Sequence, residues 1–334
     1  MTDDDSAVEL LVQQLGHLFS SAVDRPARQR AEQGEWLSSV WTACEEMGVP
    51  LLLVPESAGG FDLGWSAAFE VFKLLGRHGV PLPLGETMIA AHLLARAGLE
   101  VPSGPLTFAA GSDLESVPWA RDSGHVVVAL DTETKLYGVS TDMVTRGANI
   151  GRDARDRVDL NDSDCLASAE RSDGACARAM QGGAVLRAGQ IAGAIAQACE
   201  MAIEYTNVRV QFGKPIAKFQ AVQQSLATLA CEAAAADVAG QMGARALDGT
   251  DDPAFEVGIA KIRAGEAAGT GASLAHQVHG AIGFTDEYSL HDLTRRLWSW
   301  RSEFGSERHW AALVGSHAAE QGAALWAAIT EKAE

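Results

Sequence analysis

A sharp break between two long helix-like runs is the feature that most constrains how this chain can fold. The break covers residues 209–220, Arg-Val-Gln-Phe-Gly-Lys-Pro-Ile-Ala-Lys-Phe-Gln. Gly213 relaxes the limits on backbone dihedrals and Pro215 lacks an amide N–H, so the two interrupt a helix. Arg209 carries a planar fork of donors suited to phosphate oxygens, and the Gln220 amide can donate and accept hydrogen bonds. The pattern favours either a dinucleotide-binding corner or an ordinary helix–turn–helix with a surface arginine and a core phenylalanine.

Hydrophobic periodicity predicts two helical regions, one at each end of the chain, with a β-rich region between them. Apolar residues at three- and four-residue spacing predict helices at 7–22, 36–47, 65–76 and 88–97. Short β-rich runs between Gly, Asp and Ser turns predict strands at 105–110, 125–130, 135–140 and 157–160. From residue 176 the chain is rich in Ala and Gly, and long helices are predicted at 183–208, 219–247, 253–278 and 309–332. Small residues let such helices approach closely, as a bundle requires.

The composition excludes several classes of protein. A formal net charge of −18 argues against a nucleic-acid or anionic-membrane partner, because both need basic surface. The start, Met-Thr-Asp-Asp-Asp-Ser, lacks the order of a signal peptide, and no apolar run approaches membrane-spanning length. The five cysteines are dispersed and contain no CxxC pair, which favours reduced thiols over a disulfide framework or a zinc site. We therefore expect a cytoplasmic protein without a metal.

Three blocks of the sequence resemble the acyl-CoA dehydrogenase family, in the family's order. Residues 209–220 look like its flavin-contact motif, Arg-x-x-Phe-Gly-x-Pro-Ile-x-x-x-Gln. Residues 276–287 resemble its later Gln-x-x-Gly-Gly-x-Gly block, and residues 48–64 resemble the Val-Pro-Glu-x-x-Gly-Gly-x-Gly turn of its first domain. The resemblance implies a mainly α fold with a small β insert. We expect an N-terminal helical domain at 1–99, a reduced middle β domain at 100–172 and a C-terminal four-helix bundle at 173–334.

The same resemblance implies FAD as cofactor and assigns residues to it. Arg209 would bind the pyrophosphate, Phe212 would pack at the edge of the flavin, and Gln220 with Gln277 would bond the ribose or adenine side. His279 could pack against an adenine or fill a contact at a helix end, and the sequence leaves both open. The remaining cofactor candidates in the matching segments are Gly280, Gly283 and Ser306.

The chain departs from the family pattern where the flavin ring and the catalytic base belong. The family's Thr-Glu-x-x-x-Gly-Ser and Ile-Thr-Asn segments are absent between residues 100 and 172. The two positions where members place the carboxylate base are occupied by Phe304 and, at or near the other, by Gly183. Glu303 is one residue away and is a weak candidate base, because a one-residue shift turns a helical side chain by roughly 100°. Glu200 and Glu204 are interpreted as solvent-facing helix charges.

These observations lead to one hypothesis and two alternatives. The leading hypothesis is the shorter subunit of a heteromeric, α2β2 acyl-CoA dehydrogenase, similar to those of bacterial steroid side-chain degradation. A longer partner subunit would hold the flavin ring and the base, the substrate would be an acyl-CoA, and electron-transfer flavoprotein would be the acceptor. The alternatives are a self-sufficient homo-oligomer that uses Glu303 as base, and a structural subunit that has lost its flavin.

Overall fold

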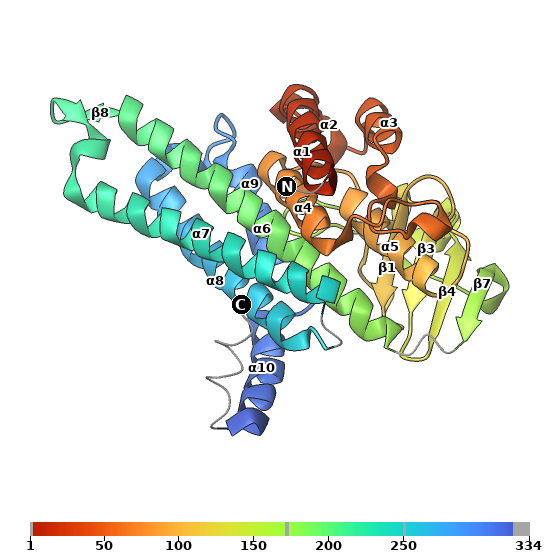
Figure 1. Cartoon of the computed structure of the whole chain (residues 1–334). Coiled ribbons are helices and arrows are strands. Elements are labelled where there is room, and N and C mark those ends of the chain that lie inside the picture. The colour runs from red at the N-terminus through yellow and green to blue at the C-terminus, as the bar shows by residue number, and fades with distance from the viewer. Residues whose placement is uncertain (1–2, 171–173, 250–251, 323–334) are drawn as a thin grey trace.

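Three parts follow one another in the computed structural model of the chain, which describes residues 3–170, 174–249 and 252–322. A helical part comes first, a β-rich part second, and a long helical bundle third (Figure 1). The first part contains α1 (Asp3–Ala22), α2 (Arg25–Glu32), α3 (Ser38–Glu46), α4 (Gly64–His78) and α5 (Leu84–Arg96). None of the helices in the described ranges is long and apolar enough to cross a bilayer.

The β-rich part is built on a four-stranded sheet with the order β1-β3-β4-β7. Its strands are β1 (Leu106–Ala110), β3 (His125–Ala129), β4 (Glu133–Gly138) and β7 (Cys165–Glu170). β1 and β3 are parallel and the other pairs are antiparallel. Phe108 and Val127 are paired in register and join the main core with the helices, while their neighbours Ala109 and Val126 pack in a separate small core. The alternation of side chains along a strand thus gives this sheet two buried faces.

A second, smaller sheet lies beside the first in the β-rich part. It contains β2 (Val117–Pro118), β6 (Arg155–Val158) and β5 (Val144–Thr145), in the order β2-β6-β5. The pairs in this sheet are antiparallel. Sequence periodicity predicted a strand at 157–160, which begins two residues after the observed start of β6 at Arg155. It missed β2 and β5, which are only two residues long, and it also missed β7.

The bundle contains α6 (Ala175–Val208), α7 (Gln220–Gly249), α8 (Ala254–His279), α9 (Leu290–Trp300) and α10 (Glu307–Gln321). The expected helix at 309–332 is shorter here, and its residues 323–332 lie outside the described part of the chain. The sequence did not predict α9, which packs on α6 and α8. Charged residues of α9, among them Asp292 and Arg296, are buried, so the segment reads as a polar loop when only hydrophobicity is considered.

Glycines allow α4 and α6 to cross at very short range. A Cβ added to Gly193 of α6 would overlap the backbone oxygen of Lys73, and one added to Gly76 of α4 would overlap the backbone oxygen of Gln190. A Cβ on Gly189 would lie 2.7 Å from the Cβ of Phe72. The first helical part and the bundle therefore share one continuous core, in which backbone rather than side chains makes the closest contacts.

We predict that Gly193→Ala destabilises the protein by about 3 kcal/mol, because the methyl group has no space unless the two helices move apart. The measurement is urea-induced unfolding followed by circular dichroism. Gly315→Ala is the matched control, since nothing lies within 4 Å of a Cβ at this position of α10. The control should be neutral or stabilising by up to about 1 kcal/mol, as alanine is the better helix former. Equal stability of wild type and Gly193→Ala would contradict the close crossing.

Candidate functional site

The break at residues 209–220 folds as a β-hairpin at the far end of the bundle. β8 (Val210–Gln211) pairs with β9 (Lys214–Pro215), and the loop between them is Phe212-Gly213. Both loop residues have positive φ, +52° for Phe212 and +80° for Gly213, as in the two-residue hairpin turns that match strand twist. The Ile216 N–H donates to the Arg209 carbonyl at 2.9 Å and closes the hairpin.

Side chains of this hairpin are strongly exposed. Phe212 at the tip is 90% exposed, and Val208 and Val210 are also exposed. The Arg209 side chain is exposed and makes no hydrogen bond or ion pair with the described residues, and Gln220, the first residue of α7, is exposed as well. An apolar patch with a phenylalanine at its tip is typical of a surface that another molecule covers.

The second block lies at the same end of the bundle as the hairpin. Gln277 is exposed on the last turn of α8, and Gly280, with φ +64°, begins the short helix η7 (Gly280–Phe284). Gly283 is buried, and a Cβ there would lie 3.2 Å from the Cβ of His279. The two blocks meet through the rings of Tyr205 on α6 and His279 on α8, which stack with centroids 4.8 Å apart.

His279 fills a contact at the helix end. It is 3% exposed, its Nδ1 lies 2.7 Å from the Ala275 carbonyl oxygen, and its Nε2 lies 3.1 Å from the Tyr288 hydroxyl. Burial lowers the pKa of His279 below its ordinary value, so the imidazole is neutral at pH 7. These contacts correspond to the helix-end role, one of the two that the sequence left open.

Ser306 lies away from the other cofactor candidates. It is the N-cap of α10, where its hydroxyl accepts from the His309 N–H. The preceding Gly305 carbonyl accepts a hydrogen bond at 2.8 Å from Nζ of Lys261 on α8. Lys261 precedes Gln277 by 16 residues, which is about 24 Å along a helix. The structure therefore gathers seven of the eight candidates at the hairpin end and leaves Ser306 near the β-rich part.

A cleft of about 430 Å³ lies where the β-rich part meets the bundle. Its walls include Phe108, Pro118, Met180 and Phe304. The ring of Phe304 stacks on that of Phe108, with centroids 5.1 Å apart and an interplanar angle of 16°. A Cβ added to Gly183 would overlap the Phe304 ring, so the two residues that the sequence resemblance places at, or near, the family's base positions face each other here. Neither carries a carboxylate, and an aromatic ring occupies the space between them.

Glu303 is held by cationic and amide partners from the β-rich part and from α6. Its carboxylate accepts from Arg155 Nε at 2.9 Å, from Arg187 Nε at 2.6 Å and from Asn149 Nδ2 at 2.8 Å. Burial would raise the pKa of Glu303, but the charges of Arg155 and Arg187 outweigh it and hold the pKa at about 2. A general base works best when its pKa lies near the operating pH. The geometry of Glu303 is therefore that of an ion-pair centre and gives no support to its role as a base.

Arg187 links this ion-pair centre to the first helical part. It is 1% exposed, donates from Nη2 to Glu86 of α5 at 2.8 Å, and lies 5.3 Å from the centroid of the Phe304 ring. Sequence reasoning missed Arg155 and Arg187, although an arginine within an Ala- and Gly-rich helix is a detectable signal. It also missed Lys261, which is buried and donates to the Arg301 and Gly305 carbonyls.

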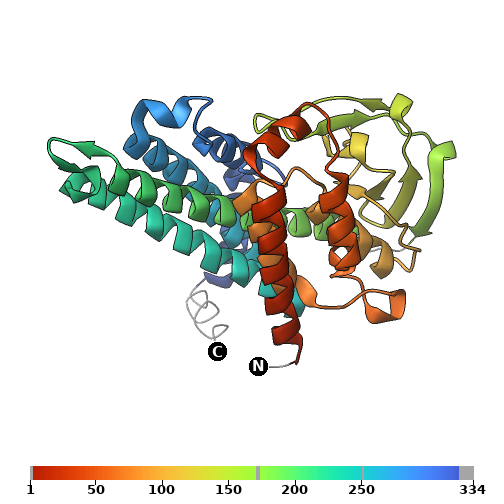
Figure 2. The ribbon, with the colours of Figure 1, turned by 90° about the horizontal axis from the view of Figure 1, so that it is seen from above.

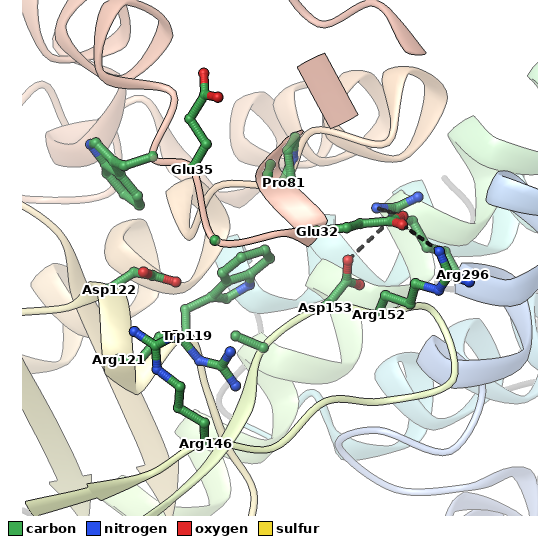
Figure 3. A pocket seen from close by; sticks show the side chains of 14 residues that line it. Glu32, Glu35, Pro81, Trp119, Arg121, Asp122, Arg146, Arg152, Asp153 and Arg296 are labelled. Carbon is green, nitrogen blue, oxygen red and sulfur yellow. Dashed lines mark hydrogen bonds and ion pairs between the residues drawn. The ribbon is translucent and has the colours of Figure 1, made fainter. Parts of the chain in front are cut away.

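A small hollow between α2, the 152–154 loop and α9 is the subject of Figure 3. Glu32, Arg152, Asp153 and Arg296 turn toward one another beside it (Figure 3). Glu32 pairs with Arg152 at 2.9 Å, and Arg296, 1% exposed, donates to Asp153 at 3.2 Å. The hollow measures about 50 Å³, far below the 300–1,000 Å³ typical of small-molecule sites. We interpret it as an inter-domain ion-pair contact. No group of metal-ligating side chains occurs among the described residues.

We predict that Glu303→Gln destabilises the protein by about 3 kcal/mol at pH 7, because it leaves the buried Arg155 without a carboxylate and removes one of the two carboxylates that pair with Arg187. The folded-state pKa of Glu303 lies below its usual value of 4.5, so the contribution is present above that pH and is lost as pH falls toward 2. Urea unfolding at pH 7 and pH 4 measures both effects, and the difference between wild type and variant should shrink at pH 4.

The matched control for that experiment is Glu200→Gln. Glu200 pairs with Arg77 at 2.5 Å, but its side chain is 55% exposed, so the change should cost less than about 1 kcal/mol. A loss at position 303 no larger than the loss at position 200 would contradict the ion-pair centre.

Comparison with known proteins agrees with this architecture. Residues 175–313 match the family model described as acyl-CoA dehydrogenase, C-terminal domain. Acyl-CoA dehydrogenase IpdE2 of Mycobacterium tuberculosis is 28% identical over 256 residues, which cover 76% of this chain and 78% of the relative. The solved Tcur3481–Tcur3483 steroid ACAD G363A variant superposes with a TM-score of 0.84 at 22% identity and covers 95% of this chain and 99% of its own.

The ChsE4–ChsE5 complex from Mycobacterium tuberculosis also has the same fold, with a TM-score of 0.84 at 18% identity over 97% of this chain and 99% of the matched one. These likenesses confirm the expected fold, with its helical first part, its β-rich middle and its helical bundle. By its C-terminal sequence match and by its fold, this chain is similar to the acyl-CoA dehydrogenases.

Proposed function

We propose that this chain is the cofactor-completing subunit of a flavin-dependent acyl-CoA dehydrogenase. It contributes Arg209, Phe212, Gln220 and Gln277 to the ADP half of an FAD whose ring is held by a longer partner subunit. FAD, when bound, accepts the hydride from the β-carbon of the acyl-CoA, and the partner's carboxylate takes the α-proton. The residues of this chain bind and orient the diphosphate end of the cofactor.

The exposed Arg209 side chain fits this role. A guanidinium makes short, charge-assisted hydrogen bonds to phosphate oxygens, and Arg209 has no competing partner among the described residues. Phe212 is 90% exposed beside it and supplies an aromatic face for a ligand or a partner surface. A monomer would gain nothing from a solvent-exposed phenylalanine at a hairpin tip, whereas an interface buries it.

The single observation that carries the proposal is the distance between the two halves of the site. The hairpin and the β-rich part lie at opposite ends of α6 (Figure 2), and the cleft beside the β-rich part is lined by Met180, near the start of that helix. Gly183, which lies against the Phe304 ring of the cleft wall, precedes Arg209 by 26 residues, or about 39 Å along a helix. An extended FAD is too short to reach both regions of one chain. The hairpin therefore serves a cofactor seated in a neighbouring chain.

The chain's own cleft supports an unlike neighbour rather than a second copy. Phe304 and Gly183 replace the carboxylates at both family positions of the base, and Glu303 is tied to Arg155 and Arg187. A homo-oligomer would repeat these features at every site. The proposed assembly is an α2β2 heterotetramer, in line with the two-component names of the ChsE4–ChsE5 and Tcur3481–Tcur3483 structures.

We extend the proposal to substrate and acceptor. The name of one structural neighbour includes a steroid ACAD, so we propose a steroid side-chain CoA thioester as the substrate class, with electron-transfer flavoprotein as the acceptor. A cytoplasmic location, which the cysteine pattern favours, stays a prediction.

The test of the split site is flavin occupancy. The chain is purified alone and together with the product of an adjacent, longer acyl-CoA dehydrogenase gene, and flavin absorbance is recorded for both. We expect substoichiometric FAD on the isolated chain and one FAD per heteromeric pair. Full FAD occupancy of the isolated chain would overturn the proposal.

We predict that Arg209→Ala weakens FAD binding by the complex about 10- to 100-fold, since a hydrogen bond to a charged group contributes roughly 1.5–3 kcal/mol. Fluorescence titration of the apo-complex with FAD gives the dissociation constant. Arg245→Ala is the matched control, because Arg245 is also an exposed arginine of the bundle, on α7. If flavin content and activity survive Arg209→Ala unchanged, the structural-subunit alternative is favoured.

The homo-oligomer alternative makes a different prediction. If Glu303 is the base, Glu303→Gln should lower turnover by several orders of magnitude in an active preparation. If it is the ion-pair centre described above, the variant should lose thermal stability while turnover at low temperature is retained. Turnover measured at 10 °C, beside a melting curve, separates the two.

A further inference from the structure

We propose that His279 is a positioning residue that sets the spacing between the two blocks of the proposed cofactor half-site. It would do so through a cluster of three rings, Tyr205, His279 and Tyr288, and not by touching the cofactor. This inference rests on the proposed function for its consequence, but its structural content stands on the contacts below.

The first contact joins the ends of α6 and α8. The ring of Tyr205 stacks on His279 with centroids 4.8 Å apart and an interplanar angle of 23°. Tyr205 lies one helical turn before Arg209, and its carbonyl accepts the Arg209 N–H at 2.9 Å. Gly280 follows His279 directly. The ring pair therefore fixes the base of the hairpin against the start of the Gly280–Phe284 turn, although the segments are far apart in sequence.

The second contact orients the imidazole. The Ala275 carbonyl can only accept, so Nδ1 of His279, at 2.7 Å from it, carries the proton and donates. Nε2 of the neutral ring is then an acceptor for the Tyr288 hydroxyl at 3.1 Å. The ring of Tyr288 lies 5.0 Å from His279 and 6.2 Å from Tyr205, centroid to centroid. Both ring nitrogens and one ring face are occupied by protein groups, which leaves His279 no free edge for an adenine.

The third contact packs the Gly280–Phe284 turn against His279. A Cβ added to the buried Gly283 would lie 3.2 Å from the Cβ of His279 and 3.1 Å from Nδ1 of His276. The turn thus folds back directly onto the last turn of α8. Loss of the imidazole would leave a void beneath this turn and remove the stacking partner of Tyr205. An aromatic pair stabilises beyond the area that it buries, so its loss changes how often both segments open.

Hydrogen exchange of the full-length chain tests the positioning role. The amides of Arg209, Ile216, Gly280 and Thr285 are each hydrogen-bonded to a backbone carbonyl. We expect His279→Ala to speed their exchange at least about tenfold and to leave the β-rich part unchanged. His279→Phe retains the ring and should restore slow exchange at Arg209 and Ile216. Unchanged exchange in a folded His279→Ala protein would overturn the inference.

His78→Ala is the matched control. His78 is also the last residue of its helix, α4, and its ring packs against another aromatic ring, that of Phe19, with centroids 6.1 Å apart. It should leave exchange at all four amides unchanged. If His279→Ala does not fold, Tyr205→Leu serves in its place: it alters only α6, and it should still speed exchange at Gly280 and Thr285. Unaltered exchange there would overturn the inference equally.

Titration of the complex with FAD links the cluster to function. We expect His279→Ala to weaken FAD binding at least tenfold, His279→Phe to restore it to near the wild-type value, and His78→Ala to have no effect. A complex that holds no FAD would refute the proposed function while the exchange result still decides the positioning role. Normal FAD binding by His279→Ala would refute the link.

Discussion

The ion pairs of Glu303 are the interaction on which the arrangement of the three parts depends. One carboxylate meets Arg155 of the β-rich part and Arg187 of α6, and Arg187 continues to Glu86 of α5. A buried charge is costly unless it is paired with an opposite charge, so a different placement of the three parts would break ion pairs of this network. Lys261 holds the same turn from α8 by donating to two of its carbonyls. Glu303, the weak base candidate of the sequence, is thus a structural centre of the fold.

That centre and the hairpin lie at opposite ends of α6, and this separation shapes the proposed function. The 34 residues of α6 run from the β-rich part to the hairpin. A rigid helix fixes the relative positions of its two ends but keeps them apart, so the two ends serve different sites. At one end the rings of Phe304 and Phe108 stack in the wall of the cleft. At the other end Arg209 and Phe212 are left exposed, as expected of groups that complete a site in a neighbouring chain.

Prediction from sequence succeeded where the pattern is local. The helices at 65–76 and 219–247 and the strand at 125–130 have the expected type, because periodicity reports which residues face a core. It failed for α9, whose inward face carries Asp292 and Arg296, since buried ion pairs invert the usual rule that charges face solvent. The 209–220 break was located correctly, but no single-sequence rule indicated that two positive φ angles would turn it into a hairpin.

The sequence by itself determined the family-like blocks, the presence of Phe304 and Gly183 where the resemblance implies carboxylates, and the residues of the hairpin, because each is a matter of residue identity at a given spacing. Only the tertiary structure decided that Phe304 and Gly183 face each other, that Glu303 is an ion-pair centre and that His279 is enclosed by Tyr205 and Tyr288. These contacts join residues 9 to 148 positions apart, and their energies depend on burial and geometry that no local pattern contains.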